Sequence, residues 1–195
     1  MTVAVKSLDP DVKIVGVQAA AVPGMVASMA EGHPVQCVGA PTMADGIAVQ
    51  RPGDIPFSIL AWAADRIVTV SEAALARGLL LCLERAKQVV EPAGAAGVAA
   101  LLEHGSEIET PAVVVLSGGN IDPLLLSKLL RHGLRAADCS PVAHRSRGAR
   151  PRRLAHVPLL RPELKLFCRP DSAISHTKLV FLHELNGWRQ LNDRS

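Results

Sequence analysis

The stretch "VVVLSGGNID" (113–122) is a short apolar run that ends in a Gly-Gly turn. The run places apolar side chains on both faces, which is typical of a strand buried on both sides. The residues that follow, "PLLLSKLLRHG" (123–133), begin with proline, keep an amphipathic helical spacing and end at glycine. A doubly apolar strand followed by a helix indicates a parallel sheet covered by helices.

The residues before this stretch repeat the alternation of strands and helices. Ser71 stands where a helix N-cap is expected, with Glu72 in the first turn, and Gly105 stands where a later helix should end. We therefore predict an α/β fold with a mostly parallel sheet flanked by helices. The expected strands cover 13–18, 66–70 and 112–116, a long loop covers 40–54, and helices cover 21–31, 57–65 and Ser71 to about Lys87.

The composition limits the class of protein. The 195 residues are enough for one domain with a hydrophobic core. Hydrophobic residues make up 49% of the chain, yet no run of about 18 uncharged apolar residues occurs, so we expect no membrane span. The start "MTVAVKSLDPDVK" lacks the apolar core of a signal peptide. The four cysteines form no CxxC pair, which favours reduced thiols in the cytoplasm over disulfides or a zinc site.

The charge divides the chain near residue 137. Residues 1–137 carry ten Lys and Arg against thirteen Asp and Glu, whereas residues 138–195 carry eleven against five. We expect residues 1–137 to form the folded domain and the Arg- and Pro-rich segment 138–195 to be a tail of unclear fold. This tail would be either disordered or the product of a shifted reading frame in the coding DNA. Comparison of the coding DNA in all three frames tests the shifted-frame hypothesis. The rival interpretation is a basic tail for nucleic acid, but the segment lacks interleaved aromatic residues, so we expect no nucleic-acid partner.

Three loops carry unusual chemistry: 42–46 ("TMADG"), 89–95 ("VVEPAGA") and 116–120 ("LSGGN"). Ligands of open α/β sheets bind at the carboxyl ends of the strands. The glycines of the last loop would let a ligand approach the backbone, and the helix after it could offer free N–H groups to an anion. Each loop alone is equally consistent with an ordinary turn.

Taken together, the segments resemble one family in order and spacing. The motifs "KIVGVQ", "TMADGIAVQRPGDIPFSIL", "DRIVTVSE", "ERAKQVVEPAGA" and "VVVLSGGNID" are similar to those of the pyridoxal-phosphate-dependent threonine dehydratases, with serine dehydratases and serine racemases as near relatives. The resemblance covers about residues 10–135. It implies part of a tryptophan-synthase-β-like (PLP fold type II) large domain, the cofactor pyridoxal 5'-phosphate, an amino-acid substrate, and a cytoplasmic lyase of isoleucine biosynthesis.

The resemblance also assigns roles to five residues. Ser117 would hydrogen-bond the pyridine nitrogen, with Gly118 beside it in the turn. Gly46 would pack near the ring with Asp45 next to it, and Glu91 would lie near cofactor and substrate. A hydroxyl cannot hold a pyridinium proton as a carboxylate would, so the ring would be a mild electron sink suited to eliminating a β-hydroxyl. Asp45 could instead brace its turn, and Glu91 could be a charge at the N-terminus of the next helix.

Three parts of the family's site have no counterpart in these residues. The Gly-rich loop that cradles the cofactor phosphate and the Asn-containing substrate loop are both absent. The family forms a Schiff base through a lysine in an "S-F-K-x-R-G-A"-like motif. No such motif is present around the six lysines, at positions 6, 13, 87, 128, 165 and 178. We therefore expect the isolated chain to contain no catalytic residue and to be inactive.

The partners and the metal are also expectations. Relatives with a divalent metal carry Glu and Asp where this chain has Gln18 and Gly24, so we expect no metal site. A complementing N-terminal half or a homo-oligomer would be the protein partner of a dehydratase. The alternative is a non-catalytic α/β interaction module that associates with an intact homologue. Absence of the N-terminal half should leave exposed apolar patches.

Overall fold

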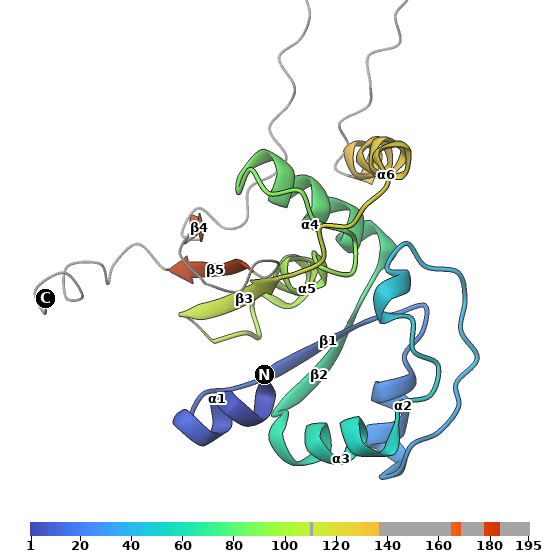
Figure 1. Ribbon diagram of the computed structural model, residues 1–195, viewed down its shortest axis with the longest axis vertical. Coiled ribbons are helices and arrows are strands. Elements are labelled where there is room, and N and C mark those ends of the chain that lie inside the picture. Colours follow the sequence, from blue (N-terminus) through green and yellow to red (C-terminus); the bar gives the residue numbers. More distant parts are fainter. Residues whose placement is uncertain (110, 137–164, 169–177, 184–195) are drawn as a thin grey trace, which may run out of the picture.

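The computed structural model describes residues 1–109, 111–136, 165–168 and 178–183 (Figure 1). Apart from two short strands, the segment 138–195 lies outside the described residues, so the predictions about it stay predictions. The elements in chain order are α1 (Thr2–Leu8), β1 (Val15–Ala19), α2 (Gly24–Glu31), η1 (Asp45–Ile47), α3 (Asp54–Ala63), β2 (Arg66–Val70), α4 (Glu72–Glu84), α5 (Ala96–His104), β3 (Ala112–Leu116), α6 (Pro123–Ala136), β4 (Lys165–Cys168) and β5 (Lys178–His183).

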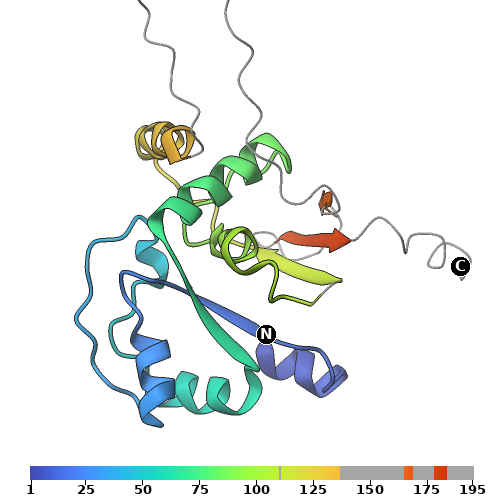
Figure 2. The same cartoon turned by 180° about the vertical axis from the view of Figure 1, so that it is seen from behind.

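Strands β1 and β2 form a parallel pair. Val15 lies opposite Arg66 at one end, and Ala19 lies opposite Val70 at the other. Ala19 and Val70 are fully buried, which places the carboxyl end of the pair in the core. Helices lie on both sides of the pair, with α2 and α3 on one side and α5 on the other (Figures 1 and 2). The predicted α/β class with parallel strands and flanking helices is confirmed.

The hydrophobic core runs along α4 and α5. Leu75 of α4 packs in a cluster with the β1–β2 pair, whereas Leu79, one turn later, packs in a second cluster with Val98 and Leu116. All four side chains are buried, and each such burial contributes about 1.5–3 kcal/mol to folding. Helix α5 contacts both β1–β2 and β3, so it connects the parallel pair to the strand that precedes the Gly-Gly turn.

Helix boundaries follow the capping signals in the sequence. Ser71 Oγ accepts a hydrogen bond from the Ala74 N–H at 3.1 Å and starts α4, and Gly105 is the C-cap of α5. The last helix departs from the prediction, because α6 continues through Gly133 to Ala136. None of the helices in the described part of the chain is long and apolar enough to cross a membrane.

Strand β3 belongs to a second sheet. It pairs antiparallel with β5, which pairs antiparallel with β4, and it forms no ladder with β1 or β2. Within the described residues, parallel pairing is therefore seen between β1 and β2. Strand β3 has the bounds that the sequence predicted, 112–116. An apolar run of five residues predicts a buried strand but does not specify which strand it pairs with.

Helix α1 is an element that the sequence did not predict. The Lys6 ammonium donates to Asp65 Oδ2 at 2.9 Å, and the same oxygen accepts the Ile14 N–H at 2.8 Å. The backbone bond from Ile14, followed by the bond from Lys6, lowers the pKa of Asp65 to about 2. Asp65 therefore ties α1 and the start of β1 to the start of β2.

Candidate cofactor site

The turn after β3 is joined to the loop before α5. Ser117 is exposed at the end of the strand, and Gly118 has φ +67°, in the left-handed region that favours glycine. The Glu91 N–H donates to the Gly118 carbonyl at 2.7 Å. The 89–95 and 116–120 loops are therefore held together through their backbones.

Close packing between these two loops excludes side chains. A Cβ on Gly118 would lie 2.1 Å from Glu91 Oε1, and a Cβ on Gly94 would lie 1.6 Å from the Ser117 carbonyl oxygen. Ordinary contacts between such atoms begin at about 3.5 Å. Glycine at both positions lets the loops interlock, with the Glu91 side chain packed against the Gly118 turn.

The 42–46 loop reaches the same place. A Cβ on Gly46 would lie 3.2 Å from Ala93 Cβ and 3.7 Å from Glu91 Oε1. The Glu91 carboxylate thus lies between Gly46 and Gly118. The structure brings together the three loops that the sequence singled out, although they are far apart along the chain.

The ordinary interpretations of Asp45 and Glu91 fare differently. Asp45 opens η1 and is exposed, and the N-cap of that turn is Ala44 with no side-chain cap bond. The Asp45 carbonyl, rather than its carboxylate, closes the turn by accepting the Ala48 N–H at 3.0 Å. Glu91 begins the turn that leads into α5, since its carbonyl accepts the Ala95 N–H at 3.1 Å, so a charge before the helix stays an alternative interpretation of Glu91. The roles of both side chains toward a cofactor stay predictions.

Glu72 is a site residue that sequence reasoning missed. Its Oε1 accepts from Thr42 Oγ1 at 2.5 Å, and its Oε2 accepts from the Met43 N–H at 2.8 Å. The sequence showed it only as an acidic residue in the first turn of a helix, and no local signal shows that it reaches a loop 30 residues earlier. This carboxylate anchors the loop that carries Gly46.

The first turn of α6 is not a free anion site, contrary to the expectation from the sequence. Asp122 Oδ1 accepts the N–H groups of Leu124 at 2.7 Å and Leu125 at 2.9 Å. These donors are satisfied, and the carboxylate repels a second anion. The Asp after "GGNI" is a capping residue for α6.

The chemistry of the three loops fits one side of a pyridine ring. Ser117 supplies a hydroxyl that can bond a ring nitrogen, and the glycine backbones supply surfaces that a flat ring can approach closely. The charged side chains of these loops are Asp45 and Glu91, both acidic, so the loops offer no cation to a phosphate. They also contain no lysine. A bound pyridoxal phosphate would need its amine and its phosphate partners from elsewhere.

Gln18 and Gly24, where metal-binding relatives carry acids, have structural contacts. Gln18 is buried, and its Oε1 accepts the N–H groups of Met25 at 3.1 Å and Val26 at 3.3 Å, which caps the start of α2. A Cβ on Gly24 would lie 2.4 Å from the Gln50 carbonyl oxygen, so this position has no space for an aspartate. Within the described residues, no three His, Cys, Asp or Glu side chains cluster as metal ligands would.

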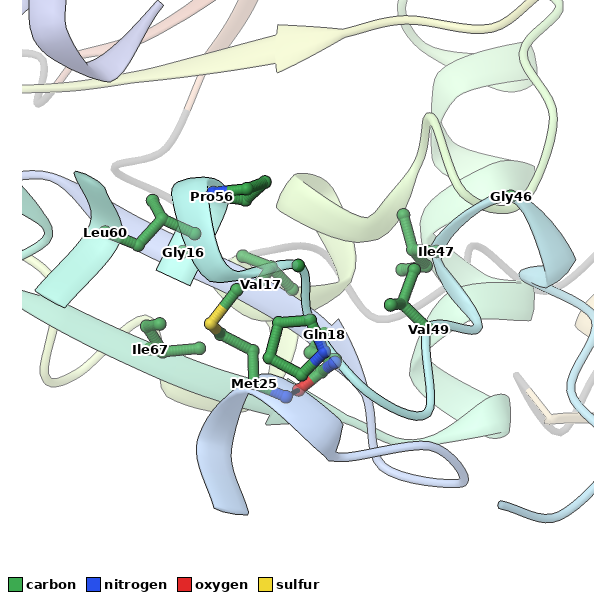
Figure 3. Close-up of a pocket in the computed structure, with 12 residues that line it drawn as sticks. Gly16, Val17, Gln18, Met25, Gly46, Ile47, Val49, Pro56, Leu60 and Ile67 are labelled. Atoms are coloured by element: carbon green, nitrogen blue, oxygen red, sulfur yellow. Dashed lines mark hydrogen bonds between the residues drawn. The ribbon is translucent and has the colours of Figure 1, made fainter. Parts of the chain in front are cut away.

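An apolar pocket of about 320 Å³ lies beside the 42–46 loop (Figure 3). It is enclosed by β1, β2, α2, α3 and the 46–53 segment, with Met25, Leu60 and Ile67 among its side chains. Gly46 lies at its edge, whereas Ser117, Gly118 and Glu91 are not part of its lining. The pocket adjoins the three-loop site through the Gly46 loop but is separate from it.

Comparison with known proteins agrees with the loop chemistry. Residues 1–118 match the family described as pyridoxal-phosphate dependent enzyme. The chain is 42% identical over 134 residues to the L-threonine ammonia-lyase of Thermotoga maritima, a match that covers 69% of this chain and 33% of that protein. It is 36% identical over 132 residues to the catabolic L-threonine dehydratase TdcB of Escherichia coli, covering 66% of this chain and 40% of that protein. The chain therefore spans about a third to two fifths of the length of the curated relatives it matches.

Solved structures show the same likeness. The threonine deaminase of T.th. superposes with a TM-score of 0.60 at 39% identity, over 62% of this chain and 44% of that one. The processed form of threonine deaminase isoform 2 from Solanum lycopersicum superposes with a TM-score of 0.60 at 27% identity, over 66% of this chain and 38% of that one. The partial type II large domain expected from the sequence is thereby confirmed.

Proposed function

The chain belongs to the family of pyridoxal-phosphate-dependent enzymes, and on that basis we propose that residues 1–137 are the C-terminal part of a threonine dehydratase. The complete enzyme would deaminate L-threonine to 2-oxobutanoate and ammonia. Relatives at 42% and 36% identity are a threonine ammonia-lyase and a threonine dehydratase, which supports threonine as the substrate class. The same resemblance supports a cytoplasmic enzyme of isoleucine biosynthesis.

One observation carries the proposal. The Glu91 carboxylate packs between Gly46 and Gly118, and the backbone of Glu91 is bonded to Gly118 next to Ser117. These are the positions that the resemblance assigns to one side of the cofactor. Three ordinary turns would have no reason to converge on one carboxylate.

Ser117, Gly118, Gly46 and Glu91 form what we call the cofactor wall, and each of these residues would have a distinct task. Bound pyridoxal phosphate supplies a ring that withdraws electrons from the substrate α-carbon. The Ser117 hydroxyl would bond the ring nitrogen without stabilising a proton there, because a neutral hydroxyl stabilises a pyridinium charge less than a carboxylate does. The backbones of Gly46 and Gly118 would orient the ring by close contact. Glu91 would stand at the substrate side and orient the amino acid.

The amine and the phosphate partners would come from outside these 195 residues. The three loops are acidic and contain no lysine, and three of the described lysines bond other groups. Lys6 and Lys13 contact Asp65 at 2.9 Å and 3.6 Å, Lys87 bonds the Glu84 carbonyl at 2.7 Å, and Lys128 lies on α6. An N-terminal half, as part of a longer chain or as a separate partner, would complete the site.

A complementation assay tests the proposal. The 195-residue chain is co-expressed with the N-terminal part of the Thermotoga maritima relative, and 2-oxobutanoate is measured after addition of L-threonine. We expect no product from the chain alone, product from the pair, and a loss of roughly tenfold or more from the pair with Ser117→Ala. Product from the chain alone would overturn the proposal, and so would a co-purifying pair that binds no cofactor.

Exposed apolar side chains fit both the proposed fragment, whose N-terminal half would cover them, and the second candidate, a non-catalytic interaction module. Ile55 and Trp62 of α3 are 74% and 69% exposed, and Leu124 of α6 is 75% exposed. Large apolar groups at the surface are typical of faces that a partner covers. A module would co-purify with an intact dehydratase and change its activity, whether or not Ser117 is present. Dependence of the complex's activity on Ser117 separates the dehydratase from the module.

A further inference from the structure

Glu72 directs both carboxylate oxygens to a distant loop rather than to its own helix. The N-terminus of α4 is capped by Ser71, whose Oγ accepts the Ala74 N–H. Glu72 Oε1 accepts from the Thr42 hydroxyl and Oε2 from the Met43 N–H. The carboxylate is partly buried and makes no ion pair within the described residues. Its two bonds to the loop are therefore its main interactions.

The bonds from Glu72 continue toward Gly46. Thr42 has one hydroxyl hydrogen, which it donates to Glu72, and its oxygen accepts the Ala44 N–H at 3.1 Å. Ala44 is fully buried, and its carbonyl accepts the Ile47 N–H at 3.1 Å. This turn contains Gly46, where an added Cβ would lie 3.2 Å from Ala93 Cβ and 3.7 Å from Glu91 Oε1. The position of Gly46 thus depends on a chain of bonds that begins at Glu72.

We propose that Glu72 is a positioning residue that holds the 42–46 loop so that Gly46 closes the cofactor wall beside Glu91. This role rests on the proposed function, since the wall matters only if the site takes the cofactor. Glu72 itself belongs to α4, which is anchored in the core by Leu75 and Leu79. The helix therefore fixes the position of the Glu72 carboxylate, and the two hydrogen bonds of this carboxylate fix the position of the 42–46 loop.

The geometry predicts that a carboxylate is required and that an amide is not enough. In Glu72→Gln, the amide oxygen can still accept the Met43 N–H, but the NH₂ group can only donate to the Thr42 oxygen, so the hydroxyl hydrogen loses its carboxylate acceptor. Replacing two bonds to a charged carboxylate by neutral ones should raise local opening of the loop by about tenfold. Glu84→Gln is the matched control, because Glu84 lies on the same helix and its side chain has no bond to the loop.

Amide hydrogen exchange of the full 195-residue chain, without cofactor, tests the loop. We expect exchange in 42–48 to rise about tenfold in Glu72→Gln and to stay within about twofold of the parent in Glu84→Gln, while α5 stays protected in both. Thr42→Val should reproduce the effect, and Thr42→Ser, which keeps the hydroxyl, should restore protection. The double variant Glu72→Gln/Thr42→Val should lose less than the sum of the two single variants, because both affect the Thr42–Glu72 bond while each also affects a separate bond, to Met43 or to Ala44.

Cofactor affinity in the complemented protein tests the link to the site. Glu72→Gln should raise the Kd for pyridoxal phosphate by about threefold or more, because a displaced Gly46 no longer presents its backbone to the ring, while Glu84→Gln leaves the Kd unchanged. Unchanged loop exchange in Glu72→Gln, or unchanged cofactor affinity in a complex whose parent binds, overturns the proposal. Failure of the proposed function has a different signature: the complemented parent protein would bind no cofactor, while the exchange difference between Glu72→Gln and Glu84→Gln would persist.

Discussion

Replacing Gly118 by alanine should separate the 116–120 loop from the 89–95 loop at the candidate cofactor site. Alanine in the left-handed conformation that Gly118 adopts, φ +67°, costs about 1–2 kcal/mol. The new Cβ would also lie 2.1 Å from Oε1, 2.5 Å from Cδ and 2.7 Å from Cγ of Glu91. A rotation of the carboxylate cannot relieve all three clashes, so the side chain must leave its position, and overpacking of this kind costs about 1–3 kcal/mol. The two effects together predict a loss of roughly 2–5 kcal/mol.

Gly119→Ala is the matched control in the same turn. The nearest atom to a Cβ at Gly119 is the Val89 carbonyl oxygen at 3.7 Å, an ordinary contact, and Gly119 is exposed. Its effect on the free energy of unfolding should stay within about 0.5 kcal/mol. Urea unfolding followed by far-ultraviolet circular dichroism measures both variants, and with an m-value of about 2 kcal/mol/M the Gly118→Ala midpoint should fall by about 1–2.5 M. Equal midpoints for the two variants would refute the close packing of Glu91 against Gly118.

Three further predictions concern the supports around the site. Ser71→Ala removes the N-cap of α4 and a bond to Glu103, and should cost about 1–2 kcal/mol in urea unfolding; no loss would show that the cap is not formed. The pKa of Asp65 is lowered from 3.8 to about 2, so its contribution to stability is present above pH about 4 and is lost as the pH falls toward 2. Acid titration should therefore show a stability loss over that range that Asp65→Asn lacks, and identical acid profiles would contradict the Lys6 and Ile14 contacts. Burial raises the pKa of the Cys82 thiol to about 12, so iodoacetamide at about pH 8 should label half-buried Cys37 in the folded chain and Cys82 only in urea; rapid labelling of Cys82 in the native chain would contradict its burial.

Local signals in the sequence predicted the elements well. The strands 66–70 and 112–116, the N-cap at Ser71 and the stop at Gly105 all depend on residues within one turn of each other, and all are confirmed. The loops were recognisable because glycine is needed where backbones approach closely, as Gly94 and Gly118 do.

Contacts between distant segments could not be predicted from such signals. Glu72 has the pattern of an ordinary first-turn acid until the fold brings Thr42 to it. The N-terminal helix α1 is seven residues long and depends on the Lys6–Asp65 contact across the fold. Each of these features is decided by a partner that the local pattern does not identify.

Titration of the 195-residue chain with pyridoxal phosphate, followed by absorption spectroscopy, is the most direct test of the central claim. The claim is that the chain carries the Ser117 side of the cofactor site but not the lysine and the phosphate partners. We predict no saturable one-to-one band of lysine-bound cofactor from the chain alone, because the three loops offer two hydroxyls and two carboxylates but no amine and no cation for the phosphate. Addition of the N-terminal part of the Thermotoga maritima relative should produce that band, and Ser117→Ala should perturb it. A saturable one-to-one band from the chain alone would contradict this interpretation of the site.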